Sequence, residues 1–228
     1  MTERILVWDL PLRIFHWTLA ASVFGALVTA ESERLRDVHV MLGYTALGLV
    51  AFRIVWGFVG TRYARFAAFL HRPAALRRYA ASLLRGRPER HVGHNPPGAL
   101  AIPVLLSLTA ATGLSGWALF EEVGGEWLEE AHEALAFTLL AAIVLHVAGV
   151  LASSFLHREN LVLSMITGRK HGVPGEAIGR PRRGVALLLG AAIAGFWLSV
   201  LTDRDRPPEP SVLEARSAIS AEASSRLD

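Results

Sequence analysis

Long apolar segments separated by short polar loops dominate the chain. A transmembrane helix needs about 20 mostly apolar residues, and five segments come close to that length. They cover residues 15–30, 39–60, 100–120, 131–156 and 184–201. The pattern therefore predicts an all-α protein with five membrane-spanning helices, embedded in a lipid bilayer.

Composition agrees with the membrane class and narrows the chemistry. Of the 228 residues, 52% are apolar, and the mean hydropathy of +0.38 is too high for an ordinary soluble domain. The chain has no cysteine, which excludes disulfides, thiolate-bound iron–sulfur clusters and covalent c-type haem attachment. Any metal or redox group must therefore use His, Met, Tyr, carboxylates or backbone. The net charge of +3 does not indicate nucleic-acid binding, because the basic residues gather in loops between the apolar segments.

The loops predict how the chain is oriented in the membrane. Residues 61–97 carry eight arginines against one acid, and residues 157–183 carry six basic residues against two acids. On the opposite side, residues 31–38 carry two arginines against three acids, and residues 121–131 carry five glutamates and no base. The positive-inside rule then predicts a cytoplasmic N-terminus. Residues 202–228 would lie outside the cell, and their Pro, Ser, Ala and mixed charges predict a disordered tail.

Two segments admit a second interpretation. Residues 15–30 follow Arg4 and Arg13 and end on small residues, so a cleaved signal peptide stays open beside a retained helix. Residues 73–86 fit an interfacial helix whose arginines reach lipid headgroups, and they fit a solvated basic helix equally well. In the interfacial interpretation, the side chains facing lipid are Leu76, Tyr79, Leu83 and Leu84.

Four histidines lie within the apolar segments or at their ends: His16, His39, His132 and His146. An ionisable side chain inside a bilayer is energetically expensive and by default indicates a functional site. A single membrane histidine more often serves packing or hydrogen bonding, but four on three predicted helices favour a set of ligands. The histidines at 71, 91, 157 and 171 lie in basic loops and are interpreted as surface residues. His94 either caps the third apolar helix or contributes to a site at the cytoplasmic face.

The depths of these four histidines match in two pairs. His132 and His146 are fourteen residues apart, which is about 21 Å of helix and close to four turns, so both lie near one helix face. With the predicted orientation, His39 matches His132 near the outer face, and His16 matches His146 near the cytoplasmic face. Neutral imidazole is a common axial ligand of haem iron. The spacing therefore predicts two bis-histidine haem sites, one above the other.

Small residues and arginines accompany the histidines. Gly43 and Gly48 follow His39, and several alanines lie near His132 and His146. Such small residues leave room for planar macrocycles, but they also simply help membrane helices to pack. Arg53 lies fourteen residues after His39, near the predicted cytoplasmic end. It fits a haem propionate as partner, although reaching to lipid headgroups is an alternative. Arg13, beside His16, is a further candidate for cofactor binding at that level.

Seven segments, in this order, resemble the bacterial cytochrome b561 and nickel-hydrogenase b-type cytochrome family. They are VWDLPLRIFHW (7–17), DVHVMLGY (37–44), FRIVWGFVGTRYARF (52–66), GHNPPG (93–98), AHEALA (131–136), LHVAGV (145–150) and SFLHRENLVLSMITGRK (154–170). The resemblance covers roughly residues 5–170. It implies a four-helix bundle in the bacterial inner membrane that binds two haems b, with the family's haem ligands falling on His16, His39, His132 and His146. The resemblance thus divides the chain into a dihaem domain over residues 1–170, a linker and additional helix over 171–201, and the tail from 202.

The resemblance also implies a function, namely electron transfer between the quinone pool and another redox protein. The partner is a cytochrome c, a dehydrogenase or a hydrogenase subunit, because the chain carries no such module itself. Two alternatives remain: an oxidoreductase that passes electrons from a small molecule such as superoxide to quinone, and a haem-free proton or metal transporter. Apart from Glu133 near the start of the fourth, the first four apolar segments contain no Asp or Glu, which counts against the transporter. The oligomeric state and any quinone site stay open.

Overall fold

The computed structural model describes residues 3–68, 73–86 and 89–204. Its elements, in chain order, are β1 (Glu3–Leu6), α1 (Leu10–Thr29), the 3₁₀ turn η1 (Glu33–Leu35), α2 (Arg36–Val59), η2 (Phe66–Ala68), α3 (Pro73–Leu84), α4 (Pro96–Phe120), α5 (Trp127–His157), α6 (Leu161–Thr167), β2 (Arg169–Gly172), η3 (Pro174–Glu176) and α7 (Arg183–Arg204). The chain is thus all-α apart from one pair of short strands. The five predicted spans are confirmed as helices α1, α2, α4, α5 and α7, each long and apolar enough to cross a membrane.

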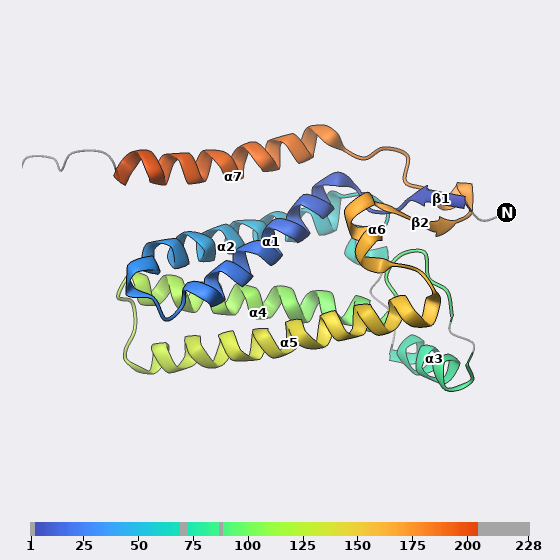
Figure 1. Ribbon diagram of the computed structural model, residues 1–228, viewed down its shortest axis with the longest axis horizontal. Helices are drawn as coiled ribbons and strands as arrows, with labels where there is room; N and C mark the ends of the chain where they lie inside the picture. The colour runs from blue at the N-terminus through green and yellow to red at the C-terminus, as the bar shows by residue number, and fades with distance from the viewer. Residues whose placement is uncertain (1–2, 69–72, 87–88, 205–228) are drawn as a thin grey trace, which may run out of the picture. The chain divides into compact units, whose positions relative to one another are not determined.

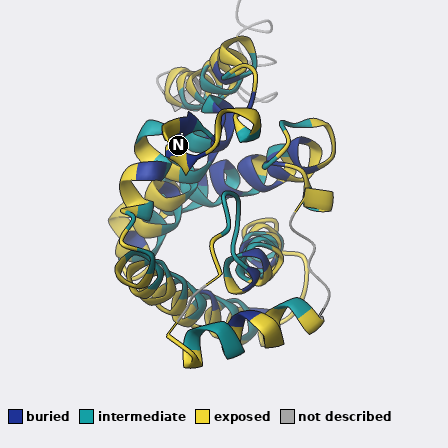
Figure 2. Ribbon diagram, turned by 90° about the vertical axis from the view of Figure 1, so that its right-hand side faces the viewer, coloured by how far each residue is buried: buried dark blue, intermediate teal, exposed yellow. Residues whose placement is uncertain are grey.

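Four of these helices form one bundle. Helix α1 packs against α2, α2 against α4, and α4 against α5 (Figure 1). Most residues of the four helices are exposed or half-buried (Figure 2), and in the whole of α5 only Leu128 and Leu139 are buried. Large apolar side chains such as Phe24 and Phe155 are exposed. This distribution suits helices whose outer faces lie in hydrocarbon rather than in water.

Polar side chains define where the helices begin. Asp9 precedes α1 and accepts a hydrogen bond from the backbone N–H of Leu12, and Asn95 does the same for Gly98 at the start of α4. Such caps satisfy donors that a helix start leaves without partners. Asp9 is fully buried and also accepts from the indole N–H of Trp56 on α2 and from the hydroxyl of Thr61. One carboxylate therefore joins the start of α1 to the end of α2.

The chain beyond α6 returns to the N-terminal strand. Strand β1 pairs antiparallel with β2, and the carbonyl of Gly168 accepts from the N–H groups of both Val7 and Trp8. Gly168 has a φ of 80° and ends α6 in the left-handed conformation, which glycine adopts without strain. Strand β2 spans the expected boundary between residues 170 and 171, and the first compact unit of the chain is Met1–Gly190. The 171–182 segment thus packs on the N-terminal part of the chain.

The predicted helix over 73–86 is confirmed as α3, with one correction. Tyr79 does not face lipid: it is only 2% exposed, and its hydroxyl lies 3.0 Å from Nε2 of His157. The amide of Asn95 also donates to this hydroxyl, so a polar contact with protein has displaced the expected contact with lipid. His157 is accordingly half-buried rather than a surface residue. At the C-terminal end, α7 continues to Arg204, and the remainder of the predicted tail, like His71, lies outside the described residues.

Candidate functional site

His39 and His132, which we call the outer pair, face each other from two helices. His39 lies near the start of α2 and His132 near the start of α5, and their ring centroids are 6.3 Å apart with an interplanar angle of 77°. Both side chains are half-buried. A metal–nitrogen bond of about 2 Å to each ring places the centroids of two opposed imidazoles about 6 Å apart. The outer pair therefore fits a single metal atom held between the two rings.

Hydrogen bonds determine which nitrogen of each ring is available. Nδ1 of His39 lies 2.9 Å from the carbonyl oxygen of Ala26 on α1. Nδ1 of His132 lies 3.1 Å from the carbonyl oxygen of Thr112 and 2.9 Å from the hydroxyl of Ser115, both on α4. A carbonyl only accepts, so Nδ1 carries the proton in each ring. Nε2 is then the free lone pair, and the donated hydrogen bond makes it a better metal ligand.

His16 and His146, the inner pair, come from α1 and α5. The two imidazoles are close enough to interact electrostatically, and both are half-buried. Within the described part of the chain, Nδ1 of His16 is buried without a hydrogen-bond partner. The ring packs edge-on against Trp17, with centroids 5.1 Å apart. The structure therefore brings together both pairs that the spacing predicts, at two levels of one bundle.

Groups of three or more His, Asp or Glu side chains suited to a metal ion do not occur among the described residues. Two separate pairs suit a metal that brings four in-plane ligands of its own, which is the arrangement in haem. Open space next to the histidines agrees with this. Gly43 lies one turn after His39 and Gly149 one turn after His146, and a Cβ added at either glycine would meet nothing within 4 Å. The residues present therefore fit two haems, with Nε2 as the expected ligand atom of His39 and His132.

One glycine is instead required by close packing. A Cβ at Gly116 on α4 would lie 2.9 Å from Cε1 of His132, which is closer than real Cβ contacts come. The absence of a side chain at this position allows the imidazole to approach α4 closely, where Thr112 and Ser115 receive its Nδ1–H. The sequence did not predict a role for Thr112, Ser115 or Gly116. The only feature that links them in the sequence is their spacing, which places them on one helix face.

The two predicted arginines have protein partners. Arg13 donates to the carbonyl of Ile166 and so fastens α1 to α6, next to Trp17, whose indole N–H donates to Met165. Arg53 is 2% exposed, and its guanidinium lies 5.0 Å from the ring centre of Phe66 and interacts electrostatically with Asp9. A propionate is therefore not needed to explain the burial of Arg53, and cofactor contacts of either arginine stay predictions.

Polar contacts also surround His94 and Lys170, near β2. The ring of His94 packs against Trp8, with centroids 4.7 Å apart. Lys170 is 5% exposed; its ammonium donates to the carbonyl of His91 and lies 3.8 Å from the carboxylate of Glu159. Burial lowers the pKa of Lys170, and Glu159 partly offsets this effect. These contacts tie the 90–94 loop to the strand pair and help hold the start of α1 in place.

Comparisons with known proteins agree with this site. The family described as prokaryotic cytochrome b561 matches residues 7–168. Curated relatives, each named a probable Ni/Fe-hydrogenase B-type cytochrome subunit, occur in Azotobacter chroococcum mcd 1 (27% identical over 72% of this chain and 87% of the relative) and Azotobacter vinelandii (26%, with the same coverage). A third, from Rhodobacter capsulatus, is 22% identical over 73% of this chain and 81% of the relative. No solved structure shows a significant match. The chain is therefore a multi-pass membrane protein of the prokaryotic cytochrome b561 family.

Proposed function

We propose that this protein is a dihaem electron carrier, which passes electrons across the bilayer between the quinone pool and a redox protein. The observation that carries the proposal is the outer pair, whose two imidazoles oppose each other at 6.3 Å with both Nδ1 atoms engaged by backbone carbonyls. The inner pair lies on α1 and on the same helix α5, with His146 about 21 Å further along α5 than His132.

Haem b supplies a reversible one-electron couple at iron when it is bound. The protein's part is to hold ligands and exclude competing chemistry. With His39 and His132 at one level and His16 and His146 at the other as its iron ligands, each haem would have no coordination site left for oxygen or substrate, which would favour electron transfer over oxygen activation. The carbonyls of Ala26 and Thr112 accept from Nδ1 and so orient the rings of His39 and His132 with Nε2 left available.

The names of the relatives suggest a hydrogenase as the redox partner. The loop that joins α4 to α5 supports a docking surface near the outer pair. The loop and the first turn of α5 together carry five glutamates, all exposed, and exposed Val123 and Trp127 lie among them. Because His132 follows Trp127 by only five residues, a partner bound at this loop would sit close to the outer haem. The loop's charge favours a partner with a basic surface.

The first experiment is a pyridine haemochrome assay on detergent-purified protein, with two non-covalent haems b per chain as the expected result. His132→Ala should then lose the outer haem and keep the inner one, and His16→Ala should do the reverse. His171→Ala is the matched control, because this histidine is exposed and far from both pairs in the chain. Its backbone N–H donates to Glu159, and the substitution leaves that hydrogen bond in place. A folded wild-type protein without haem, purified from cells supplied with haem precursor, would refute the proposal.

A second experiment measures whether the protein passes electrons from a hydrogenase to quinone. In membranes that contain a hydrogenase and this protein, hydrogen should reduce the haem, and a quinone analogue should reoxidise it. The control is the same membrane with the His132→Ala variant. Reduction by small donors such as superoxide without any partner protein would instead favour the small-molecule oxidoreductase.

A further inference from the structure

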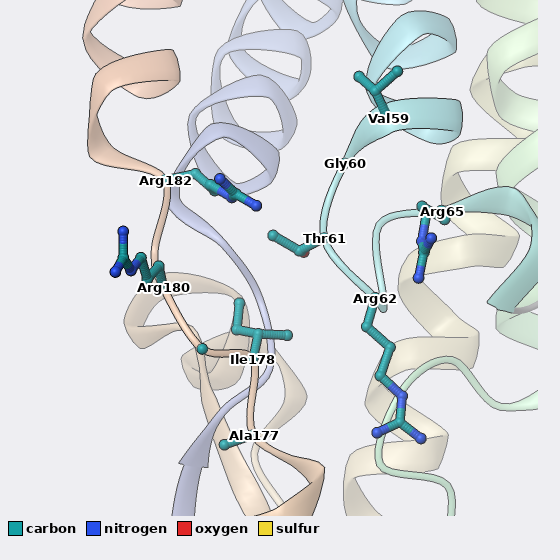
Figure 3. Close-up of a pocket in the computed structure, with 10 residues that line it drawn as sticks. Val59, Gly60, Thr61, Arg62, Arg65, Ala177, Ile178, Arg180 and Arg182 are labelled. Atoms are coloured by element: carbon teal, nitrogen blue, oxygen red, sulfur yellow. The ribbon is translucent and has the colours of Figure 1, made fainter.

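A basic cavity lies away from the histidines, at the end of the bundle expected to face the cytoplasm. It has a volume of about 510 Å³, within the usual range for small-ligand sites. One wall is the end of α2 at Val59 and the loop that follows it, and the other is the segment from Ala177 to Arg182, just before α7 (Figure 3). All of these residues belong to the first compact unit.

Four arginines line the cavity, two from each wall: Arg62, Arg65, Arg180 and Arg182. Acidic side chains are absent from its lining as far as the chain is described, and none of the ion pairs found in that part involves these arginines. Figure 3 shows the side chain of Arg182 pointing into the space between the walls, toward Thr61. The Thr61 hydroxyl already donates its proton to Asp9, so the arginines are the side-chain donors that the cavity offers.

The location of the cavity decides between kinds of anion. Val59 is the last residue of the spanning helix α2 and is 68% exposed, and the spanning helix α7 begins at Arg183, directly after the lining residue Arg182. The cavity thus lies where two apolar spans end and the arginines begin. A ligand here would meet guanidinium groups from both walls and the exposed apolar end of α2 beside them. A free anion uses only the guanidinium groups, whereas a phospholipid also places its acyl chains along the apolar helix end.

We propose that this cavity binds the headgroup phosphate of an anionic phospholipid. Guanidinium groups donate paired hydrogen bonds to phosphate oxygens, and basic pockets at the ends of membrane helices suit such headgroups. The lack of lining carboxylates favours an anionic headgroup, because a zwitterionic lipid would bring an ammonium group without a partner. This site is independent of haem binding and of electron transfer.

The test measures lipid retained by the detergent-purified full-length protein, using native mass spectrometry after incubation with phosphatidylglycerol or phosphatidylcholine. Wild type should retain phosphatidylglycerol and not phosphatidylcholine. The double variant Arg65→Gln/Arg182→Gln should bind phosphatidylglycerol at least about tenfold more weakly, since a charge-assisted phosphate contact is lost on each wall. The matched control is Arg77→Gln/Arg78→Gln on α3, which removes the same charge from exposed positions on the same face but outside the cavity.

Three results would overturn the proposal. Equal loss of lipid in the control would mean that binding reflects overall charge alone. Equal retention of phosphatidylcholine by wild type would mean that the headgroup is not selected. Displacement of the lipid by millimolar inorganic phosphate would assign the cavity to a free phosphate instead. An unchanged thermal unfolding midpoint in the variants shows that the fold is intact; should the double variant fail to fold, Arg182→Gln alone tests the same point.

Discussion

Replacing Gly116 by alanine tests whether His132 is held as a ligand. The added Cβ would stand 2.9 Å from Cε1 of the ring, whereas ordinary contacts begin at 3.4 Å, so something must move by about half an ångström. The ring cannot swing away freely, because its Nδ1 is engaged by Thr112 and Ser115 on the same helix as Gly116. Ligand distances at a metal tolerate only about 0.2 Å. The substitution should therefore disturb the outer haem more than the fold.

The expected energies separate these two effects. In a helix interior, alanine stabilises by about 1 kcal/mol relative to glycine, and overpacking costs about 1–3 kcal/mol. The unfolding free energy should thus change by no more than about 2 kcal/mol. The outer haem, by contrast, should be lost or altered in its low-spin spectrum and midpoint potential, while the inner haem keeps both.

Haem content, electron paramagnetic resonance and an optical redox titration measure these quantities on one preparation. The control is Gly190→Ala on α7, where the added Cβ would meet nothing within 4 Å. This control should leave both haems unchanged. If Gly116→Ala bound two haems with both low-spin signals and potentials of the wild type, His132 would not be the ligand that we infer. Loss of both haems in a folded protein would mean that the two sites are not independent.

Two further predictions concern buried charges. Lys170→Met removes the donor to the carbonyls of His91 and Gly93 and the cation beside Glu159, so unfolding in detergent should become easier by about 1–3 kcal/mol. Because burial lowers the pKa of Lys170 below 10.5, the folded state holds this proton less tightly than the unfolded chain. The unfolding free energy of wild type relative to Lys170→Met should therefore rise with pH from the lowered pKa to 10.5, and a flat difference would contradict burial of the charge. Arg53→Leu should lower the midpoint potential of the inner haem, since a nearby cation favours the reduced form. Arg53→Lys keeps the charge, so its midpoint potential should stay close to that of the wild type. An unshifted potential in the leucine variant would place Arg53 away from the haem.

The sequence alone was enough to predict the five spans and the close approach of His39 to His132. A span follows from about 20 apolar residues in a row, and a helix advances about 1.5 Å per residue, so depth in the membrane can be counted along the chain. His132 and His146 share a helix face for the same reason. His39 and His132 indeed face each other in the structure. These features are local, or follow from local periodicity together with the bilayer thickness.

Only the tertiary structure decided what surrounds those residues. The carbonyl of Ala26 that orients His39 is on another helix, and no residue type marks a carbonyl as an acceptor, because every residue carries one. Tyr79 matched a lipid-facing pattern, yet it is buried against His157, seventy-eight positions away. The pairing of β1 with β2 and the cavity between Arg65 and Arg182 likewise join distant segments. Such contacts depend on how the helices pack and on the paths of the loops between them. The local pattern of apolar and polar residues determines neither.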